Sequence, residues 1–193
     1  MADLLESLEY SRETFQRLSF KDDDAAGRDF DRCVFRNCDF SGCDLRGSSF
    51  SDCTFVDCSL SLCGLTNASF KGVSFESSKI IGLNFARCNP RFLGFSFKSC
   101  ELDACNFSGL SLERTAFDYC TVTECSFTDT RLKRSTFTKT DLAGSSFERA
   151  DLSEADLSSA RNYTINPTVT NVRGARFSLL EAASLLQVFE IRL

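Results

Sequence analysis

Histidine and tryptophan are both absent from this chain of 193 residues, and proline occurs only twice. The missing histidine removes the commonest general base and the commonest metal ligand of proteins. The net charge of −5 argues against nucleic-acid binding through contacts to the phosphates. The first ten residues have no basic flank before an apolar stretch, and no apolar run is long enough to cross a bilayer. We therefore expect a cytoplasmic protein that binds neither nucleic acid directly nor membrane.

What the chain has in excess is phenylalanine, with 20 residues, and cysteine, with 11. Large apolar residues recur every five positions from Phe30 to Phe85 and again from Phe97 to Leu157, and a small residue lies two positions before almost every one. A period of five fits neither a helix nor an ordinary strand. The pattern predicts a coil in which each five-residue unit forms one side, with the large and the small residue inward and the other three outward.

The order of the cysteines predicts the size of that coil. Three cysteines spaced by five recur 20 residues later (Cys33, Cys38 and Cys43; Cys53, Cys58 and Cys63). A repeat of 20 residues means four sides per coil, and like residues then stack about 4.8 Å apart in neighbouring coils.

A metal or redox role for the cysteines is the alternative to a packing role. Their spacing does not match the ligand spacing of zinc modules, and each cysteine occupies a small inward position, where free cysteine packs as a small hydrophobe. The carboxylates fall outward on a regular surface, and no serine or threonine has a histidine beside it. We expect no catalytic residues, no metal and no cofactor.

Changes in the repeat predict five segments. Residues 1–29, where Glu13 and Asp23 occupy small positions, are expected to form an irregular N-terminal coil or cap, followed by a first solenoid block at 30–85. Residues 86–96 contain two extra residues and Pro90 and are expected to form a kink or small loop. A second block is expected at 97–160. Residues 161–193 are then a linker and a C-terminal helix, which begins at a capping box of Ser178 and Glu181.

Units such as Cys38-Asp39-Phe40-Ser41-Gly42 and Thr140-Asp141-Leu142-Ala143-Gly144 resemble the repeat unit of the pentapeptide-repeat family. The resemblance covers residues 30–157 and implies an all-β fold, a right-handed quadrilateral β-helix, here with a short C-terminal α-helix. The central break and the tail at 165–167 are similar to those of the topoisomerase-protecting Qnr, MfpA, McbG and AlbG group. That similarity implies a homodimer, a DNA mimic that binds DNA gyrase or topoisomerase IV and protects it from an antibiotic or toxin.

The tail has more apolar surface than a cap on a solenoid end requires. The expected dimer interface consists of Leu179, Leu180, Ala183, Leu186, Phe189, Ile191 and Leu193.

The outward carboxylates leave two interpretations open: a solvated surface that keeps a rod soluble, or a surface that imitates DNA. One column of large inward residues consists of Leu102, Val122 and Leu142. The charged residues that flank this column are Glu101, Asp103, Glu124 and Asp141, with no Lys or Arg. Near the C-terminal end, three further carboxylates meet only Arg149 and Arg161. The expected partner-binding face comprises Glu101, Asp103, Asp118, Glu124, Asp141, Asp151, Glu154 and Asp156. The alternative function is a structural or scaffolding repeat protein with an unrelated protein partner.

Overall fold

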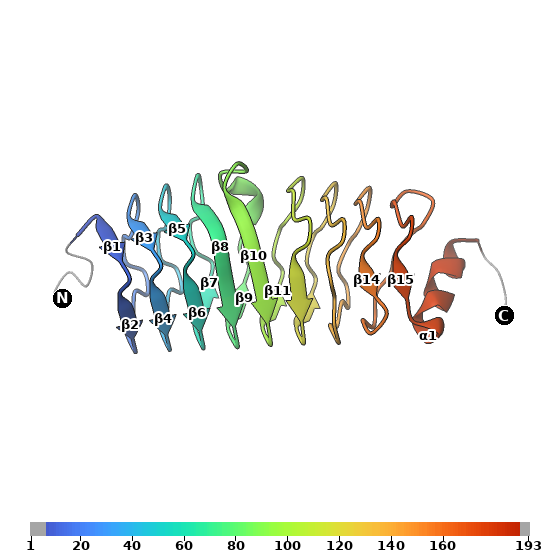
Figure 1. The fold of residues 1–193 in the computed structure, drawn as a ribbon, viewed down its shortest axis with the longest axis horizontal. Helices are drawn as coiled ribbons and strands as arrows, with labels where there is room; N and C mark the ends of the chain where they lie inside the picture. The colour runs from blue at the N-terminus through green and yellow to red at the C-terminus, as the bar shows by residue number, and fades with distance from the viewer. Residues whose placement is uncertain (1–6, 190–193) are drawn as a thin grey trace.

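The computed structural model describes residues 7–189, which form a rod of stacked coils (Figure 1). The chain winds through about eight turns, and its strands pair in parallel with the strands of the neighbouring coils. The elements are β1 (Glu9–Ser11), β2 (Thr14–Gln16), β3 (Asp29–Asp31), β4 (Val34–Arg36), β5 (Ser49–Ser51), β6 (Thr54–Val56), β7 (Ser59–Ser61), β8 (Ser69–Glu76), β9 (Lys79–Ile81), η1 (Phe85–Arg87), β10 (Leu93–Lys98), β11 (Glu101–Asp103), β12 (Ala116–Asp118), β13 (Thr121–Thr123), β14 (Asp156–Leu157), β15 (Arg176–Phe177), α1 (Leu179–Ala182) and η2 (Ala183–Phe189). The predicted right-handed quadrilateral β-helix is confirmed.

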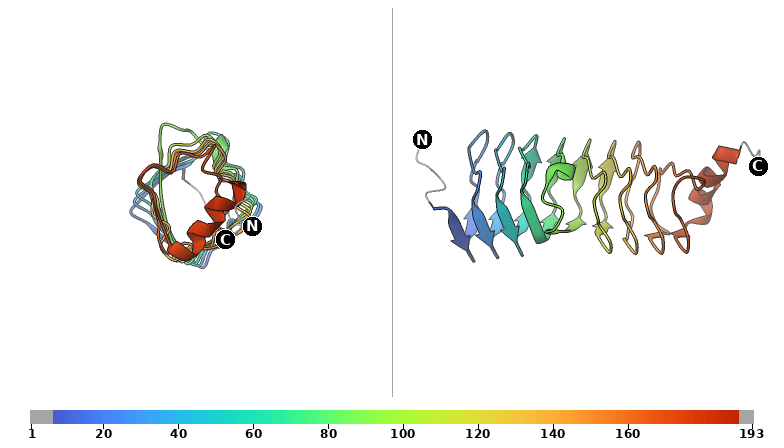
Figure 2. Two further views of the ribbon diagram at one scale, coloured as in Figure 1. Left: turned by 90° about the vertical axis from the view of Figure 1, so that its right-hand side faces the viewer. Right: turned by 90° about the horizontal axis from the view of Figure 1, so that it is seen from above.

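Each coil has four sides, seen end-on in Figure 2, and we call them faces A to D in chain order. Strands β1, β3, β5 and the first part of β8 lie on face A, and β2, β4, β6 and the second part of β8 on face B. Strands β7, β9, β11 and β13 form face C, which is opposite face A, and face D closes the coil. Paired residues are 20 positions apart, as in Phe30↔Phe50 and Phe35↔Phe55, so the predicted coil size is confirmed.

The core consists of columns of stacked side chains, one column per face. On face B the Phe117 and Phe137 rings are 5.1 Å apart and almost parallel, at 1°. On face D the Phe127 ring stacks between those of Phe107 and Phe147, with centroids 5.1 Å away on each side. In-register pairing brings identical positions one above another, and a five-residue period keeps each column on one face.

The small inward residues fill the corners and satisfy buried carbonyl groups. Thr130 Oγ1 donates a hydrogen bond to the Phe107 carbonyl oxygen at 2.9 Å, and Cys53 Sγ contacts the Phe30 carbonyl oxygen at 3.3 Å. All eleven cysteines are buried and free. Burial raises the pKa of the Cys53 thiol to about 12, so that this thiol is neutral at physiological pH.

The rod is interrupted between its fourth and fifth coils, where a turn takes 22 residues: Phe75 pairs with Phe97. Strands β8 and β10 run straight over the corner between faces A and B, and their register shifts between Leu93 and Phe95. The extra residues lie between η1 and β10, where the loop projects from the rod and Phe92 is exposed (Figure 1).

The regular coil extends beyond the blocks expected from the sequence at both ends. Glu9 pairs with Asp29 in the 20-residue register, although the first coil carries carboxylates at small positions. After residue 160, where a linker was expected, Asn171 still pairs with Asp151 and Arg176 with Asp156.

The chain then closes the rod with α1, which lies across its end (Figure 2). Ser178 Oγ accepts a hydrogen bond from Glu181 N at 3.2 Å, as expected for the helix N-cap. The Glu181 carboxylate, however, accepts from the Asn162 backbone N–H at 3.0 Å. The helix has one α-turn and continues as the 3₁₀ helix η2. Within residues 7–189, no helix has the length and apolarity needed to cross a membrane.

Candidate partner-binding face

Face C carries the acidic residues that the sequence grouped around one column. Glu101 and Asp103 flank the buried Leu102 on β11, and Glu124 follows β13 at the next corner. Thr121 pairs with Glu101 on one side and with Asp141 on the other. Because neighbouring coils are about 4.8 Å apart, the backbones of Glu101 and Asp141 lie about 10 Å apart along the rod.

The expectation that this column contains no Lys or Arg is wrong at both ends. Lys79 Nζ lies 3.4 Å from Glu101 Oε1, and Arg161 Nε lies 3.0 Å from Asp141 Oδ2. The longer coil at the interruption aligns Lys79 with Glu101, and the continuation of the rod past residue 160 aligns Arg161 with Asp141. Lys79 and Glu101 are both about half exposed, so this ion pair contributes little to stability.

The middle of the column is unopposed within the described part of the chain. Asp103 accepts a hydrogen bond from Thr123 Oγ1 at 2.8 Å and has no ion pair there. Glu124 also has none, and its carboxylate lies over Gly144, where any side chain would collide with it. Gly144 therefore leaves room for Glu124 on this face.

Asp141 is partly enclosed, with 18% of its side chain exposed. Burial alone would raise its pKa, but the Asn162 side chain, the Ala143 backbone N–H and Arg161 donate to the carboxylate. The net effect is a pKa below the usual range, because these hydrogen bonds and the charge of Arg161 stabilise the carboxylate more than the loss of solvation destabilises it.

The other predicted acidic residues lie on different faces. Asp118 and Asp156 lie on face B, and Asp118 Oδ1 is buried without a hydrogen-bond partner in the described region. Asp151 and Glu154 lie on face A, opposite the column on face C. The eight residues therefore do not form one continuous surface.

The cations near the C-terminal carboxylates also differ from the expectation. Glu154 lies 2.6 Å from Arg134 and 3.3 Å from Lys133, and Asp156 lies 3.5 Å from Arg176. These partners are 20 or 21 positions away in the sequence, as expected for contacts between neighbouring coils of 20 residues.

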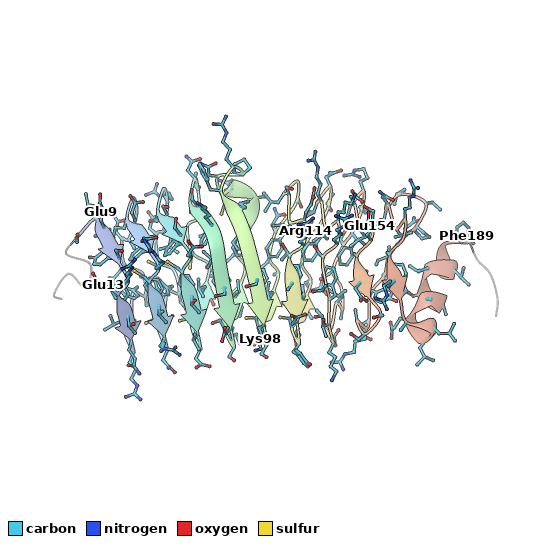
Figure 3. All side chains as sticks on the ribbon, viewed as in Figure 1. Glu9, Glu13, Lys98, Arg114, Glu154 and Phe189 are labelled. Carbon is cyan, nitrogen blue, oxygen red and sulfur yellow. The ribbon has the colours of Figure 1, made fainter. Side chains whose placement is uncertain are left out.

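Opposite faces of the rod differ in charge. Face C carries Asp22, Asp39, Glu101, Asp103, Glu124 and Asp141 against Lys21, Lys79 and Arg161. In the sixth and seventh coils, face A carries Arg114, Arg131, Lys133 and Arg134 against Glu113, whereas face C carries Glu124 and Asp141 and no Lys or Arg. In its other coils face A also carries carboxylates, among them Asp52 and Glu154. In Figure 3, Arg114 and Glu154 lie along the same side of the rod.

The predicted dimer residues lie at the C-terminal end, where Figure 3 labels Phe189. Leu179 and Leu180 are 93% and 90% exposed, and Phe189 is 53% exposed. Ala183 and Leu186 are also exposed. Ile191 and Leu193 lie outside the described residues.

Within residues 7–189, no group of three or more Cys, Asp or Glu side chains is placed to hold a metal ion.

Comparison with known proteins gives a family and several solved structures. Residues 28–95 and 89–157 match the pentapeptide repeat region. No curated protein matches the sequence. A trypsin-treated variant of QnrB1, a plasmid-mediated fluoroquinolone resistance protein, matches with a TM-score of 0.68 and 20% identity, over 97% of this chain and 99% of that one.

Two further solved structures match at similar identity. Full-length QnrB1 matches with a TM-score of 0.55 and 17% identity, over 95% of this chain and 100% of that one. HetL, involved in the regulation of heterocyst differentiation in the cyanobacterium Nostoc sp. strain PCC 7120, matches with a TM-score of 0.69 and 19% identity, over 89% of this chain and 85% of that one. These likenesses describe a shared fold.

Proposed function

We propose, from the premise that this chain belongs to the pentapeptide repeat family, that it is a DNA mimic that binds a type II topoisomerase through face C. DNA gyrase and topoisomerase IV hold duplex DNA on a basic surface, and a rigid rod with one acidic side competes for that surface. Occupying the DNA site would protect the enzyme from an antibiotic or toxin that acts on the enzyme–DNA complex.

The observation that carries the proposal is the one-sided acidity of the rod. Eight coils span about 40 Å, and a duplex of that length carries about 23 phosphate charges. A net charge of −5 cannot imitate such a duplex as a whole. Asp103 and Glu124 are the centre of the patch, because they have no ion pair within the described residues, and Glu101 and Asp141 extend it. Binding through such a patch is steered by charge and weakens as salt rises.

The fold supports the proposal less than face C does. QnrB1 and HetL resemble this chain about equally well in structure, although one is a fluoroquinolone resistance protein and the other is involved in the regulation of heterocyst differentiation. A scaffolding protein needs the same solenoid but does not need an acidic side opposite a basic one. Face C is therefore the feature that distinguishes the two functions.

We propose further that two chains associate through their C-terminal ends to form a two-fold dimer. Leu179 and Leu180 are almost fully exposed, although a helix that only covered the last coil would turn such residues inward. A tail-to-tail dimer would form a rod twice as long.

A supercoiling assay tests the proposed function. The protein should inhibit supercoiling by gyrase at high concentration and reduce poison-trapped cleavage complexes at lower concentration. It should need no nucleotide or metal of its own for either effect, beyond those that gyrase requires. Reversing Glu101, Asp103 and Glu124 to Lys should abolish both effects while the melting temperature changes little, because the three side chains lie on the surface.

A matched control reverses Asp52, Asp57 and Glu76, exposed residues on faces A and B, and changes the net charge equally. This control should act like the parent. If the parent affects neither gyrase nor topoisomerase IV, the scaffolding function replaces the proposal. If both reversed proteins lose activity equally, net charge alone explains the effect.

A further inference from the structure

The interruption of the rod leaves a gap in the strand pairing on face A. Strand β10 pairs with β8 from Leu93 onward but with β12 only from Ser96 onward. In Figure 1 the upper half of β10 leans away from the coil that follows it. The first part of β10 and the face A side of the sixth coil, at 111–113, are therefore not joined by a ladder.

The missing ladder leaves backbone groups of Ser111 and Glu113 without partners on that side. One coil further on, the equivalent groups are bonded: Arg131 N donates to the Leu110 carbonyl at 2.9 Å, and the carbonyl oxygens of Arg131 and Lys133 accept from the sixth coil at 2.8 and 2.9 Å. In the described chain, no backbone hydrogen bond is made by Ser111 N–H, Ser111 C=O or Glu113 C=O. Such an edge is a template for another strand.

A groove of about 280 Å³ lies along this edge. Its lining includes Gly72, Gly94, Phe95, Ser111 and Arg114. Gly94 lies close to β8, where an added methyl group would meet the Gly72 backbone nitrogen at 3.3 Å. Extended backbone thus borders an open, partly apolar channel.

The charge beside the groove is basic. Arg114 lines it, and Arg131 is paired with Ser111 in the adjacent coil. Neither arginine has an ion pair within residues 7–189, and Glu113 is the one nearby carboxylate in the lining. Lys133 and Arg134 follow Arg131 in the same coil, with Glu154 as their shared partner.

We propose that this groove is a docking site for an extended acidic segment of a partner protein, which adds a strand to the edge at Ser111–Glu113. Backbone N–H groups of the segment would donate to the two free carbonyl oxygens, and one of its carbonyl groups would accept from Ser111 N–H. Its carboxylates would face Arg114 and Arg131. The site is on face A, opposite face C, so that it does not depend on the proposed topoisomerase binding.

Amide hydrogen exchange of the full chain, followed by NMR, tests the edge directly. In the free protein the Ser111 amide should exchange at least ~10-fold faster than the Arg131 amide, because only the latter is bonded in a ladder. The probe is an acetylated and amidated heptapeptide of alternating Val and Glu. At saturation it should slow exchange of Ser111 at least ~10-fold and leave Arg131 unchanged. Equal exchange rates in the free protein would overturn the proposal.

Peptide and protein variants separate strand addition from attraction between charges. Methylation of alternate backbone nitrogens of the peptide should weaken binding at least ~10-fold, since it removes the donors but no charge. Arg114→Glu should weaken binding of the unmodified peptide by a similar factor, whereas Arg36→Glu on face B should not change it. The proposal fails if the peptide does not bind at about 1 mM, or if it binds equally well after methylation or to the Arg114 variant.

Discussion

Replacing Phe127 by alanine tests the inward register of the whole repeat. The Phe127 side chain is fully buried. Its ring stacks between Phe107 and Phe147, at interplanar angles of 3° and 6°, and stands at 89° to the Phe117 ring. A buried phenylalanine hides about 150–250 Å² from water, which is worth roughly 4–6 kcal/mol at ~25 cal/mol per Å². Alanine still buries part of this area, which reduces the loss, whereas the hydrogen-bonded coils on both sides prevent the cavity from collapsing. We therefore expect the free energy of unfolding to fall by about 3–5 kcal/mol.

Urea unfolding of Phe127→Ala and of its neighbour variant Thr128→Ala measures the difference. Thr128 points outward, and its hydroxyl accepts a hydrogen bond from Ser126 Oγ at 3.2 Å. Its replacement should change the free energy of unfolding by no more than about 0.5 kcal/mol. If the two substitutions have equal effects, Phe127 does not pack in the core and the assignment of inward positions is incorrect.

Three further predictions concern the tail, a buried thiol and a glycine on face C. Leu179→Glu should sediment as a monomer at micromolar concentration while the parent sediments as a dimer, and a monomeric parent would contradict the proposed assembly. Burial raises the pKa of the Cys53 thiol from 9.0 to about 12, so the stability that the neutral thiol contributes is complete below pH 9 and is lost as the pH rises toward 12. Between pH 9 and 12, the free energy of urea unfolding should therefore fall less for Cys53→Ala than for the parent. Equal decreases would refute this. Gly144→Ala should lower the melting temperature about as much as Gly109→Ala, because both glycines have positive φ and the Glu124 carboxylate that the new methyl group would meet is the end of a flexible side chain that can move away. A clearly larger loss at Gly144 would show that Glu124 is held over this glycine.

The core could be predicted from the sequence because its signal is local and repeated. A large residue at every fifth position assigns Phe117 and Phe127 to the interior without knowledge of any long-range contact. The 20-residue recurrence of cysteines such as Cys33 and Cys53 then gives four sides per coil and the register between coils.

The surface could be predicted less well, because its contacts depend on where the period changes. Lys79 reaches Glu101 because the fourth coil is two residues longer, so that the 20-residue spacing found within each block does not apply across the interruption. Arg161 reaches Asp141 because the coil continues past residue 160, where the five-residue spacing of large apolar residues has already stopped. The unpaired edge at Ser111 has no signal of its own in the sequence, since it arises from the straight path of β10.

The central claim is that face C binds a type II topoisomerase. Direct binding to purified gyrase and topoisomerase IV, measured from low to physiological salt, tests it with the parent and the Glu101, Asp103 and Glu124 reversal. We expect the parent to bind one of these enzymes, with an affinity that falls as salt rises, and the reversed protein to bind at least ~10-fold more weakly. Equal affinity of the two proteins, or no binding by the parent even at low salt, would contradict the claim.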